Sequence, residues 1–580
     1  MNSIKRLERE LQKRYNKSIK CSRIGDSIRV EGNVMTHEEV VAIGYRAAKT
    51  SFKQVVNDVT PFFDLNLQKI QSSSPVDGDD VIPSLNQPRT CDVLIIGAGI
   101  IGASIARELS KYELDIVLVD KEYDVAVHTS SRNDGMIHPG IASPMGTLKL
   151  QMNLRGNHLY EQVSKELGVP IRRCGSSILF RSRVSKLLIP YFVLKAKIIK
   201  MPGLSIMSKR KVYEKEPHLA PGISWGVFCA SAGVTSPYKM TVAYAENAVI
   251  NGVELRLNTE VKAMSVETDT GKILEVKTEN GVIRPMLTVN AAGAYADIIA
   301  EMADDRYYSI HPRKGEIVLL DKKKADRLTG ILGFVGDRSD KNTKGGGLVK
   351  TYENNILIGP NAFEVSSRED YSTDSDTIGR MLATKIPQVT GLVKEDVITY
   401  FSGIRAATYK EDFIIEASNK VGNLIHVAGI QSPGFASAPA IAERVEMLVG
   451  DYFSKQADAN ANFRKKEIWN PIRQAIPEVC SMPYEERTAL IRSNPDYGEI
   501  VCRCEEISRG EIIDALSGPI EIDSVDAVKR RVRAGMGRCQ GGFCLPLVME
   551  IIQSEKGIPL NQITKKGKNS TIAAHSTKEV

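Results

Sequence analysis

The chain has 580 residues, of which 42% are hydrophobic and 25% are charged, and its formal net charge is +7. This length exceeds one hydrophobic core and predicts roughly two to four domains. The 77 basic residues are nearly balanced by 70 acidic ones, so the charge gives no sign of a nucleic-acid partner. The sequence lacks both an apolar run of about 18 residues and an N-terminal signal pattern. We therefore expect a cytoplasmic protein with at most peripheral contact at the inner membrane face.

Residues 1–70 predict a small α+β module in which a capped helix follows a strand. Thr36 is placed to cap that helix, and Glu39 occupies the reciprocal capping-box position. Residues 26–59 resemble a BON-type module, a small fold often linked to membrane surfaces. If the chain contacts a membrane, this module is the expected element; a docking appendage is the alternative. The expected elements are helices over 4–15 and 40–48 and strands over 27–32 and 55–59.

The next segments predict a linker and then a dinucleotide-binding turn. Residues 71–90 are rich in Ser, Pro, Asp and Gly, which is typical of a linker. A buried apolar strand then leads into three glycines that suit a tight turn, a close approach to a pyrophosphate and tight helix–strand packing. Asp120 ends the following strand, where a carboxylate accepts hydrogen bonds from ribose hydroxyls. The turn predicts FAD or NAD without choosing between them; its glycines are Gly97, Gly99 and Gly102.

Residues 91–445 resemble the FAD-dependent family that includes D-amino-acid oxidase, glycerol-3-phosphate dehydrogenase and L-2-hydroxyglutarate dehydrogenase. The strings that carry the resemblance are 129–138, 259–261, 289–297, 403–405 and 427–434. The resemblance implies bound FAD and a β-sheet substrate domain. The sequence does not decide between covalent and non-covalent attachment, and non-covalent binding is our working assumption. The resemblance also implies the following FAD contacts: Gly97, Gly99, Gly102, Asp120, Lys121, Thr129, Ser130, Ser131, Arg132, Asn133, Val261, Ala292, Gly293, Gly429, Gln431 and Gly434.

Three side chains are candidates for substrate chemistry. Alcohol oxidation needs a base for the hydroxyl proton while hydride leaves the carbon. His138 is the first candidate and His311 the second, because imidazole titrates near neutrality; either could instead only pack against the flavin. Arg405 is expected to bind a substrate carboxylate or phosphate through a bidentate fork, or else to form a structural salt bridge.

Four of the nine cysteines form two close pairs near the C-terminus. The other five are scattered singly, which argues against a disulfide framework and indicates a reducing compartment. Four paired thiolates predict a metal site. Structural zinc usually takes Cys-x(2–4)-Cys pairs, so the Cys-x-Cys and Cys-x4-Cys spacings fit zinc poorly. The pairs are Cys502 with Cys504 and Cys539 with Cys544.

The cysteine segments, 500–506 and 534–544, resemble the bacterioferritin-associated-ferredoxin (BFD) type [2Fe-2S] domain. The resemblance implies that the four cysteines hold a [2Fe-2S] cluster. Nearby cations would stabilise the reduced cluster, could dock an acidic partner, or could line one solvated helix face. These cations are Lys529, Arg530, Arg531, Arg533 and Arg538.

The expected fold is α/β: a Rossmann-type FAD-binding domain with a β-sheet substrate domain, a small N-terminal α+β module and a small C-terminal iron–sulfur domain. The predicted order is a module over 1–70, a linker over 71–90, an oxidoreductase body over 91–450, a bridge over 451–495, a [2Fe-2S] domain over 496–560 and a disordered tail over 561–580.

The predicted enzyme is a dehydrogenase that passes hydride to FAD and then electrons through the cluster to a redox partner subunit. The resemblance implies oxidation of sn-glycerol 3-phosphate to dihydroxyacetone phosphate. However, residues 431–435 replace the Gly-Gly-Lys-x-Thr string typical of those enzymes, and residues 146–149 and 359–362 look more like the 2-hydroxyglutarate branch. The alternatives are an L-2-hydroxyglutarate or other 2-hydroxy-acid dehydrogenase, an amino-acid or amine dehydrogenase, an electron-transfer subunit of a larger flavoprotein complex, and a redox sensor.

Overall fold

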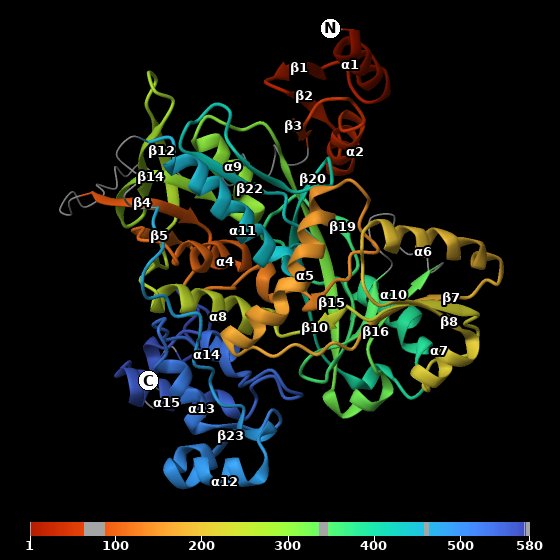
Figure 1. Ribbon diagram of the computed structural model, residues 1–580, viewed down its shortest axis with the longest axis vertical. Helices are drawn as coiled ribbons and strands as arrows, with labels where there is room; N and C mark the ends of the chain where they lie inside the picture. Colours follow the sequence, from red (N-terminus) through yellow and green to blue (C-terminus); the bar gives the residue numbers. More distant parts are fainter. Residues whose placement is uncertain (1, 63–87, 336–345, 457–462, 574, 576–580) are drawn as a thin grey trace.

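A computed structural model describes residues 2–62, 88–335, 346–456, 463–573 and 575. Along its longest axis the N-terminal module lies at one end and the cysteine-containing domain at the other, with two large sheets between them (Figure 1). The mixed α/β architecture expected from the sequence is confirmed. None of the described helices is long and apolar enough to span a membrane.

The N-terminal module is a three-stranded sheet with two helices packed against it. Strand β2 is antiparallel to β1 and parallel to β3. The predicted capping box is present, because Thr36 Oγ1 accepts a hydrogen bond from the Glu39 amide at 3.3 Å. Strand β1 is missing from the sequence prediction, because it is an exposed edge strand without apolar alternation. The elements are α1 (Asn2–Arg14), β1 (Lys20–Ile24), β2 (Ser27–Val34), α2 (His37–Ala47) and β3 (Val55–Pro61).

The first large sheet has the parallel core of a Rossmann-type domain. Its order is β11-β5-β4-β14-β13-β12, with β22 beside β14 and β21 beside β22. Successive residues of β4 point to opposite faces: Ile95 packs with helices α4, α8 and α11, whereas Ile96 packs with α9. The strands are β4 (Arg89–Ile96), β5 (Ile116–Val119), β11 (Glu254–Arg256), β12 (Val261–Val266), β13 (Ile273–Thr278), β14 (Gly281–Asn290), β21 (Ile414–Ala417) and β22 (Leu424–Ala428). The helices are α4 (Ile100–Leu109), α5 (Leu148–Leu167), α8 (Pro237–Ile250), α9 (Ala296–Met302) and α11 (Gly434–Phe453).

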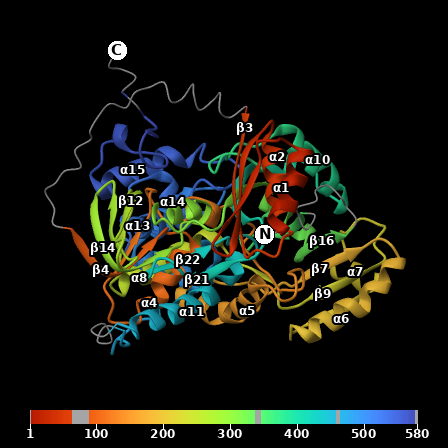
Figure 2. The ribbon, with the colours of Figure 1, turned by 90° about the horizontal axis from the view of Figure 1, so that it is seen from above.

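The second large sheet has nine strands in the order β19-β15-β18-β17-β16-β7-β9-β8, and β20 pairs with β15. Both views place the N-terminal module over the junction of the two large sheets (Figures 1 and 2). The strands are β7 (Ser176–Phe180), β8 (Leu204–Ser208), β9 (Trp225–Cys229), β15 (Ile310–Leu320), β16 (Ile331–Val335), β17 (Gly347–Lys350), β18 (Ile356–Gly359), β19 (Phe363–Glu364) and β20 (Val397–Thr408). The helices are α6 (Ile189–Ile198), α7 (Lys209–Lys215) and α10 (Ser375–Lys385).

The C-terminal domain shares its hydrophobic core with the Rossmann-type domain, and its described residues form no separate core of their own. Val501, Ile512 and Val528 belong to the same buried cluster as α4 and α8. The preceding segment, the predicted bridge, is packed along this body, with Phe463 stacked on Tyr112 at 4.1 Å. The elements are α12 (Tyr484–Ser493), β23 (Ile500–Cys502), β24 (Ile507–Ser508), α13 (Arg509–Leu516), α14 (Val525–Val532) and α15 (Cys544–Lys556).

The prediction of a disordered tail over 561–580 is wrong for its described part, which runs to residue 573. Ile563 is fully buried, and the Thr564 carbonyl accepts a hydrogen bond from the Val525 amide at 3.1 Å. Gly567 lies against the Tyr123 ring of the Rossmann-type domain. Tail residues thus join the cysteine-containing domain to the body, although polar composition suggested a solvated tail. Most of the predicted linker, and the end of the tail, lie outside the described residues.

Candidate functional site

The glycine turn after β4 is built for a close approach by a phosphate group. Gly97 has φ +105°, and a Cβ there would lie 2.6 Å from the Ala291 carbonyl oxygen. A Cβ on Gly102 would lie 1.8 Å from the Gly97 carbonyl oxygen, so only glycine allows this turn to close. Helix α4 begins directly after Gly99, and its first amide, Ile100 N, donates to Ser130 Oγ at 2.9 Å. The start of α4 and the Ser130 hydroxyl therefore form one anion-binding corner.

Asp120 lies at the end of β5, next to the turn. Its carboxylate accepts hydrogen bonds from the Ala98 amide at 2.6 Å and the Glu122 amide at 2.9 Å, and burial raises its pKa. The Thr259 amide donates to the Asp120 carbonyl at 2.7 Å, which brings the string 259–261 beside it, with the predicted FAD contact Val261 at the start of β12. Lys121 points elsewhere: its ammonium pairs with Glu369 and lies 4.2 Å from the centre of the Tyr295 ring.

The predicted FAD-contacting loop over residues 129–138 runs along the second large sheet, called the substrate sheet below because it corresponds to the predicted β-sheet substrate domain. Thr129 Oγ1 donates to the Ile404 carbonyl at 2.6 Å, and Arg132 Nη1 donates to the Ser402 carbonyl at 3.3 Å. Asn133 Nδ2 donates to the Ser130 carbonyl at 2.9 Å, and Ser131 Oγ donates to the His128 carbonyl at 3.2 Å, so the loop folds on itself. The loop thus bridges the glycine turn and strand β20.

The other predicted FAD residues follow strands of the same sheet. Ala292 and Gly293 come directly after β14, where the Ala291 amide donates to the Ile96 carbonyl at 3.0 Å beside the turn. Gly429 and Gln431 follow β22, and Gly434 begins helix α11. The carboxyl ends of parallel strands are where such folds bind nucleotides. The open start of α4, the buried Asp120 carboxylate and the glycine contacts together fit FAD.

Strands β15 and β20 place two arginines side by side on the substrate sheet. Arg313 is directly opposite Arg405, and His311 lies two positions from Arg313 on the same face. Arg313 Nε and His311 Nδ1 both contact Glu364, each at 2.8 Å. Arg405 Nη2 donates to the Asn361 carbonyl at 3.0 Å. Among the described residues, the buried Arg405 Nη1 and His311 Nε2 have no hydrogen-bond partner, which is typical of atoms reserved for a ligand.

The electrostatics of this pair favour an anion. Burial, together with the charge of Arg313, lowers the pKa of Arg405 to about 10. Arg313 is balanced by Glu364 and by Glu411, whose carboxylate lies 2.6 Å from its guanidinium. Burial raises the pKa of Glu411, but the hydrogen bond and charge of Arg313 outweigh it and lower that pKa to about 2. Arg405 is therefore the guanidinium of this pair with a buried donor left to bind an anion.

The N-terminal module reaches this same place through α2. The Tyr45 hydroxyl donates to Glu411 at 2.6 Å and accepts a hydrogen bond from Arg313. The Tyr45 ring lies edge-on to His311, at 5.4 Å between ring centres. Sequence reasoning missed Tyr45, Glu364 and Glu411 as site residues. No local motif marks them, since each contacts the site from a distant part of the chain.

His138 lies after the short ribbon of β6 (Met136–Ile137) and β10 (Gly233–Val234), and its side chain is half-buried. Its carbonyl oxygen accepts a hydrogen bond from Asn157 Nδ2 at 2.9 Å. The loop that ends at His138 is the one fixed to β20 by Thr129 and Arg132. The role of His138 as a base stays a prediction.

The four paired cysteines come together in the C-terminal domain. Cys504 Sγ lies 3.9 Å from Cys502 Sγ and 3.8 Å from Cys539 Sγ, and Cys544 contacts Cys502. Tetrahedral thiolates about 2.3 Å from one metal lie about 3.8 Å apart, so the donor set fits a metal centre. A Cβ on Gly537 would lie 2.4 Å from Cys504 Sγ. Backbone amides of Phe543, Gly541 and Gly542 point at Cys539 and lower its pKa.

A cavity of about 270 Å³ separates the predicted FAD loop from the cysteine segment. One side is lined by Ser131 and Arg132, and the other by Met536 and Gln540, the neighbour of Cys539. The predicted FAD loop and the cysteine segment therefore face the same cavity, and Arg530 and Arg533 also line it.

The basic run near the cysteines holds the domains together, which corrects two of its predicted roles. Arg530 and Arg531 both contact the fully buried Asp124, at 2.8 and 2.9 Å, and Arg533 contacts Glu505 at 3.0 Å. These three arginines are buried, so they neither line a solvated face nor reach an acidic partner. In contrast, the Arg538 side chain is 62% exposed.

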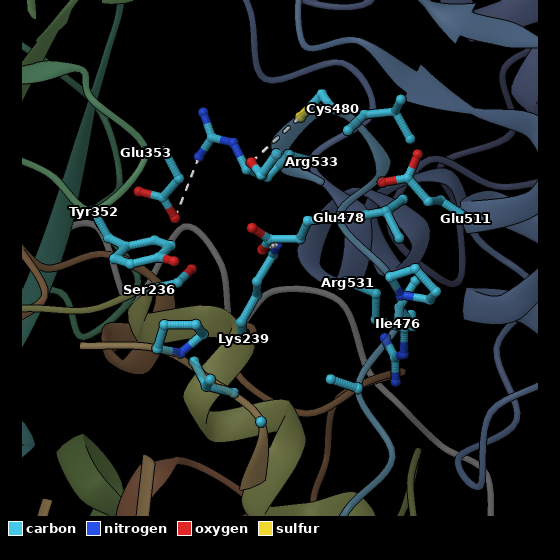
Figure 3. A pocket seen from close by; sticks show the side chains of 18 of the residues that line it. Ser236, Lys239, Tyr352, Glu353, Ile476, Glu478, Cys480, Glu511, Arg531 and Arg533 are labelled. Carbon is cyan, nitrogen blue, oxygen red and sulfur yellow. Dashed lines mark hydrogen bonds and ion pairs between the residues drawn. The ribbon is translucent and has the colours of Figure 1, made fainter. Parts of the chain in front are cut away.

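A second cavity, of about 380 Å³, lies at this interface (Figure 3). Lys239 contacts Glu478 at 2.6 Å across it, and Arg533 faces Glu353 at 3.6 Å. These two ion pairs join residues of the cysteine-containing domain and its preceding segment to the body, so we assign the cavity to the domain interface rather than to the candidate active site.

Comparisons with known proteins match both parts of this arrangement. Residues 92–447 match a family model described as FAD dependent oxidoreductase, and residues 500–554 match one described as BFD-like [2Fe-2S] binding domain. The cofactors that these domains bind, FAD and a [2Fe-2S] cluster, are the two expected from the sequence.

Three similar proteins extend the match. A glycerol 3-phosphate dehydrogenase from Caloramator mitchellensis is 38% identical over 84% of this chain and 99% of its own length. An L-2-hydroxyglutarate dehydrogenase from Nematostella vectensis is 24% identical over 63% of this chain and 91% of its own. The FAD-bound structure of L-alpha-glycerophosphate oxidase from Mycoplasma pneumoniae has a TM-score of 0.60 and 26% identity, covering 66% of this chain and 98% of that one.

Proposed function

Because this chain belongs to the FAD-dependent oxidoreductase family and carries a BFD-like [2Fe-2S] domain, we propose that it oxidises sn-glycerol 3-phosphate to dihydroxyacetone phosphate. Bound FAD supplies the two-electron acceptor, and the cluster supplies a one-electron outlet toward a partner. The observation that carries the proposal is that Arg405 Nη1 and His311 Nε2, from the same face of the paired strands β20 and β15, are both buried without a hydrogen-bond partner among the described residues. An anionic group and a neighbouring hydroxyl would satisfy these two atoms together.

In this proposal Arg405 holds the substrate phosphate, and a histidine takes the proton from the reacting hydroxyl. His138 is our candidate for that base, since it ends the loop that lies between the predicted FAD site and β20. His311 orients the substrate, because Glu364 fixes its Nδ1 at 2.8 Å and leaves Nε2 toward the site. Tyr45 and Tyr409 cover His311 on two sides, which helps to exclude water.

The second candidate is an L-2-hydroxy-acid dehydrogenase, and the sequence of residues 431–435 favours it. Residues 431–435, which replace the Gly-Gly-Lys-x-Thr string, contain no lysine, and Gln431 among them contacts Glu411 at 2.6 Å and Arg313 at 3.2 Å. A carboxylate needs fewer donors than a phosphate, so one arginine suffices for it.

The deciding experiment is anaerobic bleaching of the flavin absorbance with sn-glycerol 3-phosphate and L-2-hydroxyglutarate in parallel. We expect rapid bleaching by the phosphate and none by the hydroxy acid; the reverse result would assign the second function. Reduction by dithionite but by neither substrate would reject both and favour an electron-transfer subunit.

The R405M variant should raise the KM for the substrate about 100-fold, because a buried charge-assisted hydrogen bond to the substrate anion is lost. Steady-state kinetics with R405M would measure this, with R155M as the control at an exposed ion pair whose arginine side chain is 51% exposed. An unchanged KM in R405M would exclude Arg405 from substrate binding.

A further inference from the structure

The segment over residues 181–200 exposes a cluster of large apolar side chains. Seven of them lie within residues 184–198, whereas other exposed apolar side chains of the described chain, such as Ile468 and Tyr484, are more scattered. Contiguous exposed apolar surface usually marks an interaction site. The seven, with their exposed fractions, are Val184 (73%), Leu187 (81%), Leu188 (44%), Tyr191 (53%), Val193 (46%), Leu194 (58%) and Ile198 (57%).

The exposed side chains form a stripe along one side of the segment. Tyr191, Leu194 and Ile198 recur every three or four residues, which places them on one face of α6, and Val184 and Leu187 lie in the 3-10 turn over Val184–Leu188 that leads into the helix. The opposite side packs inward: Phe192, Ala196 and Ile199 belong to the buried cluster around Trp225. Helix α6 thus has two apolar sides, of which the protein itself covers one.

The charged residues within the segment itself are all basic. Residues 181–200 contain six basic residues and no Asp or Glu. One of the six, Lys195, is buried and donates to the Ser143 carbonyl at 2.8 Å. The exposed cations are Arg181, Arg183, Lys186, Lys197 and Lys200.

We propose that this face, residues 181–200, lies in the surface of a bilayer that contains anionic lipid. An apolar stripe flanked by Lys and Arg is the pattern of an interfacial helix, whose apolar side enters the headgroup boundary while its cations meet lipid phosphates. Tyr191 adds an aromatic ring with a polar end, which suits the same depth. Since α6 is a ten-residue helix, it lies on the membrane rather than across it.

The position of α6 in the fold allows this contact. Both views show α6 on the outer edge of the molecule, remote from the N-terminal module and from the cysteine-containing domain (Figures 1 and 2). A bilayer could therefore cover the stripe without displacing either of them. The sequence led us to expect any membrane contact to come from the N-terminal module, whereas this proposal assigns it to residues 181–200 of the substrate domain. The proposal does not depend on which substrate the enzyme oxidises.

Co-sedimentation of the full-length holoenzyme with vesicles tests the proposal. We expect binding to 3:1 phosphatidylcholine–phosphatidylglycerol vesicles, little binding to phosphatidylcholine alone, and weaker binding as salt rises, because screening shortens the reach of the cations. The L187E/L194E variant should bind at least about tenfold more weakly, since two apolar side chains no longer enter the lipid. The I468E variant, changed at a side chain that is 89% exposed elsewhere, should bind as the unaltered protein does.

Substitution of Leu187 and Leu194, whose side chains are largely exposed, should leave the fold intact, which flavin content and circular dichroism would verify. Failure of the unaltered protein to bind either vesicle, or equal binding by L187E/L194E, would overturn the proposal. A dimer in light scattering that L187E/L194E dissociates, without vesicle binding, would assign the face to a second copy of the chain instead.

Discussion

At the scale of single residues, Gly537 limits how the cysteine site can form. Its Cα lies so close to Cys504 that a Cβ would be 2.4 Å from Sγ and 3.0 Å from the Cys504 Cβ. Neither atom can move far, because Cys504 must stay within reach of Cys502 and Cys539. We therefore predict that G537A loses most of its cluster and keeps its flavin, as measured by iron content and visible absorbance.

The matched control is G379A, since nothing lies within 4 Å of a Cβ there and the residue is inside helix α10. Full cluster content in G537A would mean that the cysteine loop adapts to a side chain at this position.

Candidate site residues that belong to a short sequence motif could be predicted from the sequence. Candidate site residues that only the fold brings together could not. The spacing of the three glycines predicts a dinucleotide site and the spacing of the four cysteines predicts a metal site, whereas the identity of each cofactor came from the family resemblance. Tyr45, however, reaches Arg313 and Glu411 from another module, so only the fold brings them together. Likewise, the arginines of α14 read as a solvated basic face, because the sequence does not reveal that Asp124 is buried opposite them.

At the scale of elements, helix α2 fastens the N-terminal module to the substrate sheet. Tyr409 meets Gly44 and receives a hydrogen bond from Asn57 Nδ2 at 2.8 Å, and Lys410 Nζ donates to the Ala48 carbonyl at 2.7 Å. Strand β3 adds a backbone contact, from the Ser309 amide to the Val55 carbonyl at 2.9 Å. The sequence predicted the helices and two strands of the module, but its docking place depends on contacts with residues far along the chain.

The docking should depend on pH through Glu411. The folded pKa of Glu411, about 2, is below its ordinary value of 4.5, so its contribution is complete above pH 4.5 and is lost as the pH falls toward 2. We predict that E411Q is less stable than the unaltered protein by about 1 kcal/mol at pH 6, a value limited by solvent screening of a side chain that is 37% exposed. Thermal unfolding across pH 3 to 6 would show the difference shrinking at the acid end; a constant difference would contradict the assignment.

At the scale of the whole molecule, Asp124 joins the cysteine-containing domain to the Rossmann-type domain. It is 1% exposed, and its two oxygens accept hydrogen bonds from the guanidinium groups of Arg530 and Arg531. Burial raises the pKa of Asp124, but these two cations outweigh it and lower that pKa.

We predict that D124N lowers the free energy of unfolding by about 3–5 kcal/mol, because two buried guanidinium groups lose their carboxylate. Chemical denaturation would measure the loss, and limited proteolysis should release the C-terminal domain early. D26N, at an aspartate side chain that is 72% exposed, is the control and should change little. Equal stability of D124N and the unaltered protein would show that apolar packing alone holds the domains.

The loop after β5 contributes both to the predicted FAD site and to the contact with α14. It begins at Asp120, where the predicted ribose contact lies, and reaches Asp124, where α14 docks. Binding of flavin at Asp120 would order the loop and so favour docking of α14 at Asp124. Docking of α14 would favour flavin binding by the same amount, because such coupling is reciprocal. We therefore expect an order of maturation: flavin that enters the nascent enzyme first would set the loop and favour closure of the cysteine-containing domain. A chain starved of flavin would then leave that domain loosely attached, with its thiols open to oxidation before iron arrives.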